Sequence, residues 1–208
     1  MTHPITGVIL AGGKSLRMGR NKAFIEIDGI PIINRIHAVF KELFQEIFII
    51  TDQKELFDHL EAKSWRDLYP NRGALAGLYT GLYFSSFQYS FCVACDMPFL
   101  NPRLIHFLAQ KLDGEDVLVP KTEDGLQPLH AFYSKNCLQS IRELLDRGGD
   151  RIIDFYDSVK VRFVEEKDFL FLDPRRESFI NINTPEELSL LATTKREASF
   201  KPGERGRY

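Results

Sequence analysis

Short apolar runs alternate along this chain with segments in which apolar residues recur every three or four positions. The runs predict buried strands, which would cover residues 8–11, 24–27, 46–50, 91–94, 117–119, 129–133, 159–164 and 179–183. The segments with the longer spacing predict helices, which would cover residues 31–43, 54–63, 74–85, 102–111, 138–145 and 152–156. Strands that alternate with helices predict an α/β fold with a doubly wound, mainly parallel, Rossmann-like sheet.

The length of the chain favours one domain. Its 208 residues suffice for one well-buried α/β domain and are short for two. Residues 1–194 are expected to form this domain, and residues 195–208, which mix charges with Pro and Gly, are expected to form a loose tail. No tandem hexapeptides are present, so the sequence does not predict a β-helix extension.

Amino-acid composition and net charge do not change the predicted fold class. The formal charge of −2 gives the whole protein no electrostatic attraction to nucleic acid or to a membrane, so any phosphate binding must be local. No apolar run approaches the ~20 residues that span a bilayer, and the first residues lack the basic and apolar regions of a signal peptide. The expected location is the cytoplasm.

The three cysteines, Cys92, Cys95 and Cys137, indicate no disulfide framework. The C-x-x-C formed by Cys92 and Cys95 raises the alternative of a metal or redox site. However, it lies inside a predicted strand, where residues three apart point to opposite faces, whereas the redox motif begins a helix. Buried structural thiols are therefore the favoured interpretation.

A glycine-rich segment follows the first predicted strand. Gly12 and Gly13 lack a Cβ and allow a ligand to approach the backbone closely. Three cations follow them, namely Lys14, Arg17 and Lys22. A glycine turn that leaves a strand end and presents amides together with cations predicts a phosphate-binding loop.

Two commoner phosphate loops are excluded by spacing. A Walker A loop ending in Gly13-Lys14-Ser15 requires a glycine at position 8, where this chain has Val8. A dinucleotide-binding loop requires G-x-G-x-x-G, which this segment does not contain.

Asp96 is the strongest candidate for a metal ligand. It directly follows a buried strand and is fixed in place by Met97-Pro98. Mg²⁺ is commonly held by one or two carboxylates together with substrate phosphates and water, so a single Asp suffices. The alternative role is to cap the helix that begins after Asn101. Gly12, Thr51 and Asp96 all follow predicted strands, and the carboxyl ends of parallel strands form the ligand-binding edge of such sheets.

The segment Leu10 to Ala23 reads L-A-G-G-x-S-x-R-M-G-x-x-K-A. It resembles the signature loop of nucleotidyltransferases with a glycosyltransferase-A-like fold, and its nearest likeness is the molybdenum cofactor guanylyltransferase family. Two further segments match this family: C-D-M-P, which contains Asp96, and N-x-N-T-P-E-E, which begins at Asn181. The segment Gln127 to His130 is also similar.

The resemblance implies a single-domain fold of the nucleotide-diphospho-sugar transferase type. It also implies transfer of GMP from GTP to the phosphate of molybdopterin-bound molybdenum with Mg²⁺ as cofactor, giving molybdopterin guanine dinucleotide and pyrophosphate. Cofactor-delivery proteins and molybdoenzyme chaperones are the protein partners that the resemblance implies.

The resemblance also implies roles for individual residues. The expected catalytic residues are Lys22, Arg17 and Asp96, with Asp96 as the metal ligand. The expected GTP-binding residues are Leu10, Ala11, Gly12, Gly13, Lys22, Thr51, Asp67 and Asp96. Further candidate positions are Lys14, Ser15, Gly77, His130, Arg151, Asn181 and Asn183. Three positions depart from the family pattern, namely Asn21, Thr51 and Ala74, where the family often has Asp, Asn and Pro.

Several alternatives remain open at this stage. His130 is equally well explained as a hydrogen-bonded structural residue, and Asn181 and Asn183 as polar residues that lead into a capped helix. Guanylyl enzymes of this family resemble L-A-G-G, whereas related cytidylyl enzymes resemble L-A-A-G, so Gly12 favours the larger guanine base. The competing functions are a cytidylyl or sugar-phosphate nucleotidyltransferase, and a non-catalytic domain that senses a nucleotide.

Overall fold

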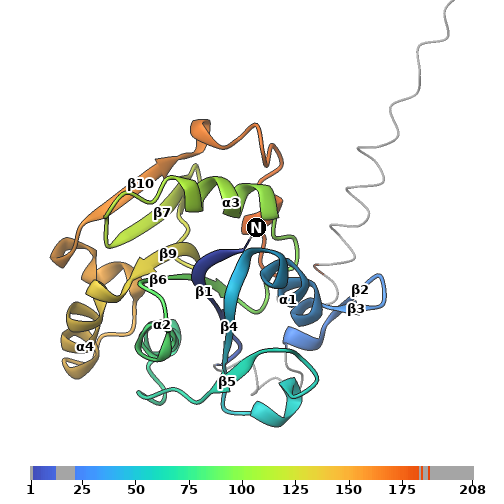
Figure 1. Cartoon of the computed structure of the whole chain (residues 1–208), viewed down its shortest axis with the longest axis horizontal. Coiled ribbons are helices and arrows are strands. Elements are labelled where there is room, and N and C mark those ends of the chain that lie inside the picture. The colour runs from blue at the N-terminus through green and yellow to red at the C-terminus, as the bar shows by residue number, and fades with distance from the viewer. Residues whose placement is uncertain (1, 13–21, 183, 185–186, 188–208) are drawn as a thin grey trace, which may run out of the picture.

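The computed structural model describes residues 2–12, 22–182, 184 and 187. Within them, an eight-stranded sheet runs through the molecule and has helices on both of its faces (Figure 1). The strands are β1 (His3–Leu10), β2 (Glu26–Ile27), β3 (Ile30–Pro31), β4 (Phe44–Ile50), β5 (Lys63–Trp65), β6 (Tyr89–Ala94), β7 (Val117–Thr122), β8 (Gly125–Leu126), β9 (His130–Ser134) and β10 (Val161–Glu165). The α-helices are α1 (Ile32–Leu43), α2 (Gly73–Phe84), α3 (Pro102–Gln110) and α4 (Leu138–Asp146).

The predicted fold class is confirmed. The main sheet has the strand order β10-β7-β9-β6-β1-β4-β5, and β8 pairs with β7 beside this path. Every neighbouring pair along the path is parallel except the two pairs made by β9, which runs antiparallel to β6 and to β7. The remaining strands, β2 and β3, form a separate antiparallel pair.

Two apolar cores cover the two faces of the sheet. Helices α1 and α3 contribute residues such as Phe40 and Leu104 to one core, while α2 and α4 contribute residues such as Leu78 and Ile141 to the other. Figure 1 shows the same division, with α2 and α4 together on one side of the strands. Asn101 caps α3 as expected, because its side chain accepts hydrogen bonds from the backbone N–H groups of Arg103 and Leu104.

The cysteines behave as the strand pattern predicts. All three are buried and free, and Cys92 and Cys95 lie in different cores on opposite faces of the sheet. Burial raises the pKa of the Cys95 thiol to about 12, so this thiol is protonated and unreactive at neutral pH. Among the described residues, no helix combines the length and the hydrophobicity that crossing a membrane requires.

Two sequence predictions are wrong. Residues 54–63 do not form a helix, because only Lys54–Phe57 forms a single 3-10 turn, and the chain then enters β5, which pairs with the edge of β4. Residues 179–182 do not form a strand, since a 3-10 turn (Glu177–Phe179) is followed by irregular chain. Asn181 therefore lies in irregular chain, and Asn183, which was expected to share its strand face, lies outside the described residues.

Helix α2 packs directly on β1 because of its glycines. A Cβ placed on Gly81 would lie 2.6 Å from Cγ1 of Val8, and one placed on Gly77 would lie 2.9 Å from Cδ2 of Leu10. Val8 and Leu10 are both buried. Gly inside a helix costs about 0.8–1.0 kcal/mol relative to Ala, so close packing of helix and strand outweighs helix propensity here.

Gly81→Ala is expected to destabilise the protein. Overpacking of a well-packed core costs about 1–3 kcal/mol, which exceeds the helix-propensity gain of about 1 kcal/mol, and the clash falls on the branched, rigid side chain of Val8. Urea denaturation of the variant should show a lower midpoint. The matched control is Gly81→Ala combined with Val8→Ala, in which the new methyl group occupies space that the trimmed side chain leaves. Additive losses in this double variant would contradict the packing argument.

Candidate active site

The candidate site is built on strand ends that lie level with one another. Leu10 at the end of β1 pairs with Ile50 of β4 and with Ala94 of β6, and Ile50 pairs in turn with Trp65 of β5. Backbone hydrogen bonds continue past these ends, from Ala11 N to Ile50 O at 2.9 Å, from Cys95 N to Leu10 O at 3.1 Å and from Thr51 N to Trp65 O at 2.9 Å. The residues that follow the strands, Gly12, Thr51, Asp67 and Asp96, are therefore held at one edge of the sheet.

This edge contains the point where the winding of the sheet reverses. From β1 the chain passes through α1 on one face to β4, and from β5 it passes through α2 on the other face to β6, on the opposite side of β1. Gly12 and Asp96 follow β1 and β6, the two strands that flank the reversal. Open α/β sheets bind ligands at this kind of switch point, outside the carboxyl ends of the strands.

Gly12, Asp67 and Gly77 lie close together at this edge. A Cβ placed on Gly12 would lie 3.9 Å from Oδ2 of Asp67, and one placed on Gly77 would lie 3.6 Å from Oδ1 of the same side chain. Gly12 is exposed, whereas Gly77 is buried in α2. The fold thus brings together three sequence-predicted residues that are separated by up to five elements along the chain.

The carboxyl group of Asp67 lacks part of the hydrogen bonding that a buried carboxylate needs. Its Oδ1 atom is buried and has no hydrogen-bond partner among the described residues. Burial and the nearby negative charge of Asp52 raise the pKa of Asp67 to about 6, and a hydrogen bond with Thr80 opposes this shift. A buried acceptor without a donor is costly, so Asp67 is ready to accept a hydrogen bond from a ligand.

Lys22 and Asp96 form an ion pair. Lys22 Nζ lies 3.7 Å from Oδ2 of Asp96, and their side chains keep 23% and 18% of their accessible surface. Lys22 opens a 3-10 turn (Lys22–Phe24), while Asp96 follows β6, so residues 74 positions apart meet at the site. A partly exposed cation beside a carboxylate is suited to a ligand that carries both phosphates and a metal ion.

The surroundings of Asp96 disfavour the charged form of its carboxyl group. Burial raises its pKa, the positive charge of Lys22 opposes that increase, and the negative charge of Glu187 adds to it. Oδ1 of Asp96 is buried without a hydrogen-bond partner among the described residues. The backbone oxygen of Asp96 accepts a hydrogen bond of 2.8 Å from Ile182 N. The sequence motif around Asn181 indicated this neighbourhood, but it gave no sign that Glu187 lies near Asp96.

The donor set of Asp96 fits a divalent cation bound together with phosphates. Its free oxygen is a hard ligand of the type that Mg²⁺ prefers, and a cation there would relieve the electrostatic cost of burying the carboxylate. In the part of the chain that the structure describes, no three His, Cys, Asp or Glu side chains gather into a metal-binding group.

Three other predicted residues occupy framework positions. Leu10 and Ala11 are buried, and their backbone groups join β1 to its neighbours. Thr51 is only 3% exposed, and its hydroxyl accepts a hydrogen bond of 3.1 Å from Gln53 N. The side chain of Thr51 therefore shapes the turn after β4.

His130 is placed differently from a substrate contact. It is fully buried at the start of β9, where its ring packs edge-on against Phe91 and Phe179 with centroid distances of 5.0 and 4.9 Å. Both ring nitrogens lack hydrogen-bond partners among the described residues, and burial lowers the pKa of His130 to about 3. His130 is a neutral core residue in this structure, and it is not the hydrogen-bonded one that the alternative interpretation expected.

Arg151 and Asn181 are exposed. Arg151 forms an ion pair of 3.8 Å with Asp154 in the segment after α4. That segment reaches the start of α2, since Arg72 donates a hydrogen bond to Gly148 O. The remaining predicted residues lie outside the described part of the chain: Gly13, Lys14, Ser15, Arg17 and Asn183.

Comparisons with known proteins agree with this geometry. Residues 7–161 match the family model described as the MobA-like NTP transferase domain. A probable molybdenum cofactor guanylyltransferase of Pelotomaculum thermopropionicum is 40% identical over 183 residues, which cover 88% of this chain and 89% of the relative. A molybdenum cofactor guanylyltransferase of Desulfosudis oleivorans is 38% identical over 96% of this chain and 97% of its own.

The fold comparison gives the same result. The crystal structure of molybdopterin-guanine dinucleotide biosynthesis protein A from Archaeoglobus fulgidus superposes with a TM-score of 0.79 at 26% identity, over 93% of this chain and all of that one. The sequence matches and this structural match each extend over most of the chain. The family model spans residues 7–161, which include Gly12, Asp67 and Asp96. The chain belongs to the molybdenum cofactor guanylyltransferases of the MobA-like NTP transferase family.

Proposed function

We propose that this protein transfers GMP from GTP to the terminal phosphate of molybdopterin-bound molybdenum, giving molybdopterin guanine dinucleotide and pyrophosphate. The observation that carries this proposal is the pairing, at one switch point, of the cluster of Gly12, Asp67 and Gly77 with the ion pair of Lys22 and Asp96. The relatives named as guanylyltransferases support the identity of the two substrates.

The guanine base is assigned to the Gly12 side of the site. The two-ring base needs room beside the strand end, and Gly12 offers it because it carries no side chain. Guanine presents N–H donors at N1 and at its amino group. Oδ1 of Asp67, which has no hydrogen-bond partner among the described residues, is an acceptor at the same edge of the sheet as Gly12.

The triphosphate is assigned to Lys22 and Asp96. An oxygen of the acceptor's phosphate attacks the α-phosphorus of GTP, a new P–O bond forms, and the bond to the bridging oxygen of the β-phosphate breaks as pyrophosphate leaves. The nucleophile is already an anion, so the protein needs no strong general base and must instead hold several anions together. Lys22 neutralises part of this charge, and Arg17 is proposed to assist it.

Asp96 is proposed to hold Mg²⁺, and the fit of its free Oδ1 supports this role. When bound, Mg²⁺ supplies charge neutralisation between the phosphate groups. The ion pair with Lys22 keeps the Asp96 carboxylate oriented at the edge of β6 before ligands arrive.

Gly13, Lys14 and Ser15 are proposed to donate backbone or side-chain groups to the phosphates, and Arg151, Asn181 and Asn183 to contact the acceptor. The cytoplasmic location and the cofactor-delivery or molybdoenzyme chaperone partners stay predictions.

Two other activities are compatible with this fold. A cytidylyltransferase or sugar-phosphate nucleotidyltransferase would use the same fold and the same Asp96, and only the base site would differ. A non-catalytic nucleotide sensor would bind GTP without turnover, although the retained Lys22 and Asp96 pair is unnecessary for that role.

GTP with Mg²⁺ is expected to raise the Tm of the protein more than CTP, UTP or ATP, because a ligand that binds only the folded state stabilises it. With molybdopterin-bound molybdenum added, pyrophosphate should be released. Asp96→Ala should fold normally, lose the Mg²⁺-dependent part of the GTP shift, and react about 10²–10³-fold more slowly, by analogy with the loss of other transition-state contacts.

The matched control is Asp58→Ala, which removes an exposed carboxylate directly after the 3-10 turn Lys54–Phe57 and should change neither readout. A CTP-selective shift would point to the cytidylyl alternative. Near-normal turnover by folded Asp96→Ala would refute the metal assignment.

Gly12→Ala is expected to lower the preference for GTP over CTP by about tenfold, the effect of ~1.4 kcal/mol in binding. The added methyl group would meet only Ile50 O at 3.7 Å and Asp67 Oδ2 at 3.9 Å within the described residues, so the fold tolerates it and its effect falls on the ligand. Competition between the two nucleotides in a pyrophosphate-release assay measures the ratio. An unchanged ratio with an unchanged Tm would show that position 12 does not select the base.

Asp67→Asn is expected to stabilise the unliganded protein above pH 6. An ordinary Asp has a pKa of 3.8 and folded Asp67 one of about 6, so the folded state binds more protons than the unfolded state between these values. Stability therefore falls as pH rises through this window, and it stays reduced above it. The variant should lose this slope and gain about 2–4 °C in Tm at pH 7.5, the shift produced by ~1 kcal/mol in a domain of this size.

The same variant should bind GTP more weakly, because the amide replaces one acceptor oxygen with a donor. Thermal scans from pH 4 to pH 8, with and without GTP, measure both effects. Asp58→Asn is the control. A variant that is both less stable at pH 7.5 and unimpaired in GTP binding would contradict the proposed role of Asp67.

A further inference from the structure

A network of charges joins two segments at the edge of the sheet that carries the active site. One segment, here called the hairpin, is the turn between β7 and β8 (residues 121–126). The other, here called the strap, comprises residues 169–182. β7 runs parallel to β6 in the sheet, so the hairpin lies at the same edge as Asp96. It stands on the opposite side of Asp96 from β1, β4 and β5, which carry the proposed GTP site.

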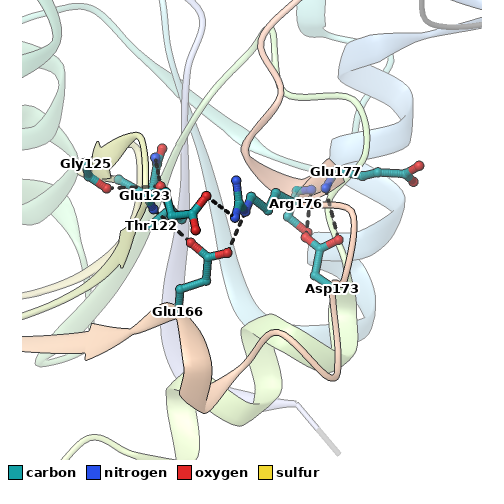
Figure 2. A network of polar contacts seen from close by, with 9 residues as sticks. Thr122, Glu123, Gly125, Glu166, Asp173, Arg176 and Glu177 are labelled. Atoms are coloured by element: carbon teal, nitrogen blue, oxygen red, sulfur yellow. Dashed lines mark hydrogen bonds and ion pairs between the residues drawn. The ribbon is translucent and has the colours of Figure 1, made fainter. Parts of the chain in front are cut away.

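Arg176 of the strap holds the hairpin through two carboxylates (Figure 2). Its Nε donates to Glu166 Oε1 at 2.5 Å, and its Nη2 donates to Glu123 Oε2 at 2.7 Å. Glu123 lies in the hairpin, and its backbone N–H donates to Glu166 Oε2 at 2.8 Å. The side chain of Glu166 is only 13% exposed, so this acidic group is shielded from water and depends on its donors.

The backbone of Arg176 is shaped for this contact. Its φ of +55° lies in the left-handed region, which is unfavourable for a residue with a long side chain. Asp173 stabilises the turn. Its carboxylate accepts a hydrogen bond from the backbone N–H of Glu177 (Figure 2) and one from the backbone N–H of Ser178, and its backbone oxygen accepts one from Arg176 N. These hydrogen bonds offset the conformational cost of the left-handed backbone at Arg176. They hold Arg176 in the conformation in which its guanidinium reaches the hairpin.

The strap is tied at its other points to the loop that carries Asp96. Asn101 Nδ2 donates to Leu172 O at 2.9 Å, and Asn101 N donates to the hydroxyl of Ser178 at 3.2 Å. Near the end of the strap, Ile182 N donates to the backbone oxygen of Asp96. The strap, through Arg176, Asn101 and Ile182, therefore connects the hairpin with the loop that carries Asp96.

We propose that Arg176 is a positioning residue for the phosphate-bearing acceptor: it clamps the hairpin against the strap, and together they form the acceptor-side wall of the active site. This inference rests on the proposed function. The GTP side of the edge is occupied by Gly12, Thr51 and Asp67, so the half beyond Asp96 is the part left for the second substrate. Without the guanidinium, Glu123 and Glu166 would face each other as like charges, and the hairpin would open.

Arg176→Ala is expected to raise the KM for molybdopterin-bound molybdenum about tenfold while leaving the Tm shift caused by GTP and Mg²⁺ unchanged. Backbone amides of residues 121–126 should exchange hydrogen faster in this variant without any ligand. Arg175→Ala is the matched control, because Arg175 is 64% exposed and forms only a long ion pair, of 4.0 Å, with Glu177 among the described residues. It should alter none of these readouts.

A charge exchange separates a clamp from a general loss of structure. Arg176→Glu should impair acceptor use more than Arg176→Ala does, because it places three carboxylates together. Adding Glu123→Arg should restore much of the acceptor KM, since an arginine on the exposed hairpin can again face two acidic groups. Failure of this double variant to recover, with normal GTP shift and Tm, would overturn the clamp.

Different results would refute the proposed function and the proposed role of Arg176. A wild-type protein that shows no GTP shift and releases no pyrophosphate with acceptor present would refute the proposed function. An active wild-type protein in which Arg176→Ala changes neither the acceptor KM nor the exchange of residues 121–126 would refute only the role of Arg176.

Discussion

The site depends on the parallel register of β6, β1, β4 and β5. Leu10 is paired with Ala94 on one side and Ile50 on the other, and Ile50 is paired with Trp65, so four strands end at the same level. Backbone hydrogen bonds fix this arrangement regardless of which side chains follow the strands. A slip of one residue in any strand would turn its side chains to the opposite face and separate Gly12, Asp67 and Asp96. The close contact of Gly77 and Gly81 with β1 locks α2 onto the same framework.

The aligned strand ends hold two carboxyl groups, those of Asp67 and Asp96, in buried positions that disfavour the ionised form. Asp67 and Asp96 both have raised pKa values, caused first by burial, and each has a buried oxygen without a hydrogen-bond partner among the described residues. Such groups lower the stability of the unliganded fold. A ligand that brings N–H donors to one and a cation to the other would recover this free energy on binding. These two acidic groups are thus the ones to which the proposed mechanism assigns the guanine base and the metal ion.

The sequence predicts much of the fold and the chemical centre because both depend on local patterns. The apolar runs gave the principal strands, and the glycine segment and Asp96 stood at their ends. The failures come from tertiary contacts. Leu56, Phe57 and Leu60 have helical spacing, yet pairing of residues 63–65 with the open edge of β4 extends the sheet and leaves only one 3-10 turn before it. Asp67 is aligned with the site through β5, so its position depends on a strand that the periodicity did not reveal.

Residues 169–182 show why the other half of the site is harder to predict. The strand expected at residues 179–183 is absent from residues 179–182. Phe169, Phe179 and Ile182 instead pack individually against the core, while polar groups between them contact other segments of the chain. No periodic pattern encodes such a path. Arg176 was indistinguishable in the sequence from the neighbouring Arg175, and only the left-handed backbone and the two glutamates set it apart. The half of the site proposed for the nucleotide is built from strand ends, and sequence patterns reveal those of β1, β4 and β6. The half proposed for the acceptor is built from irregular chain held by ion pairs, and these contacts form only in the folded structure.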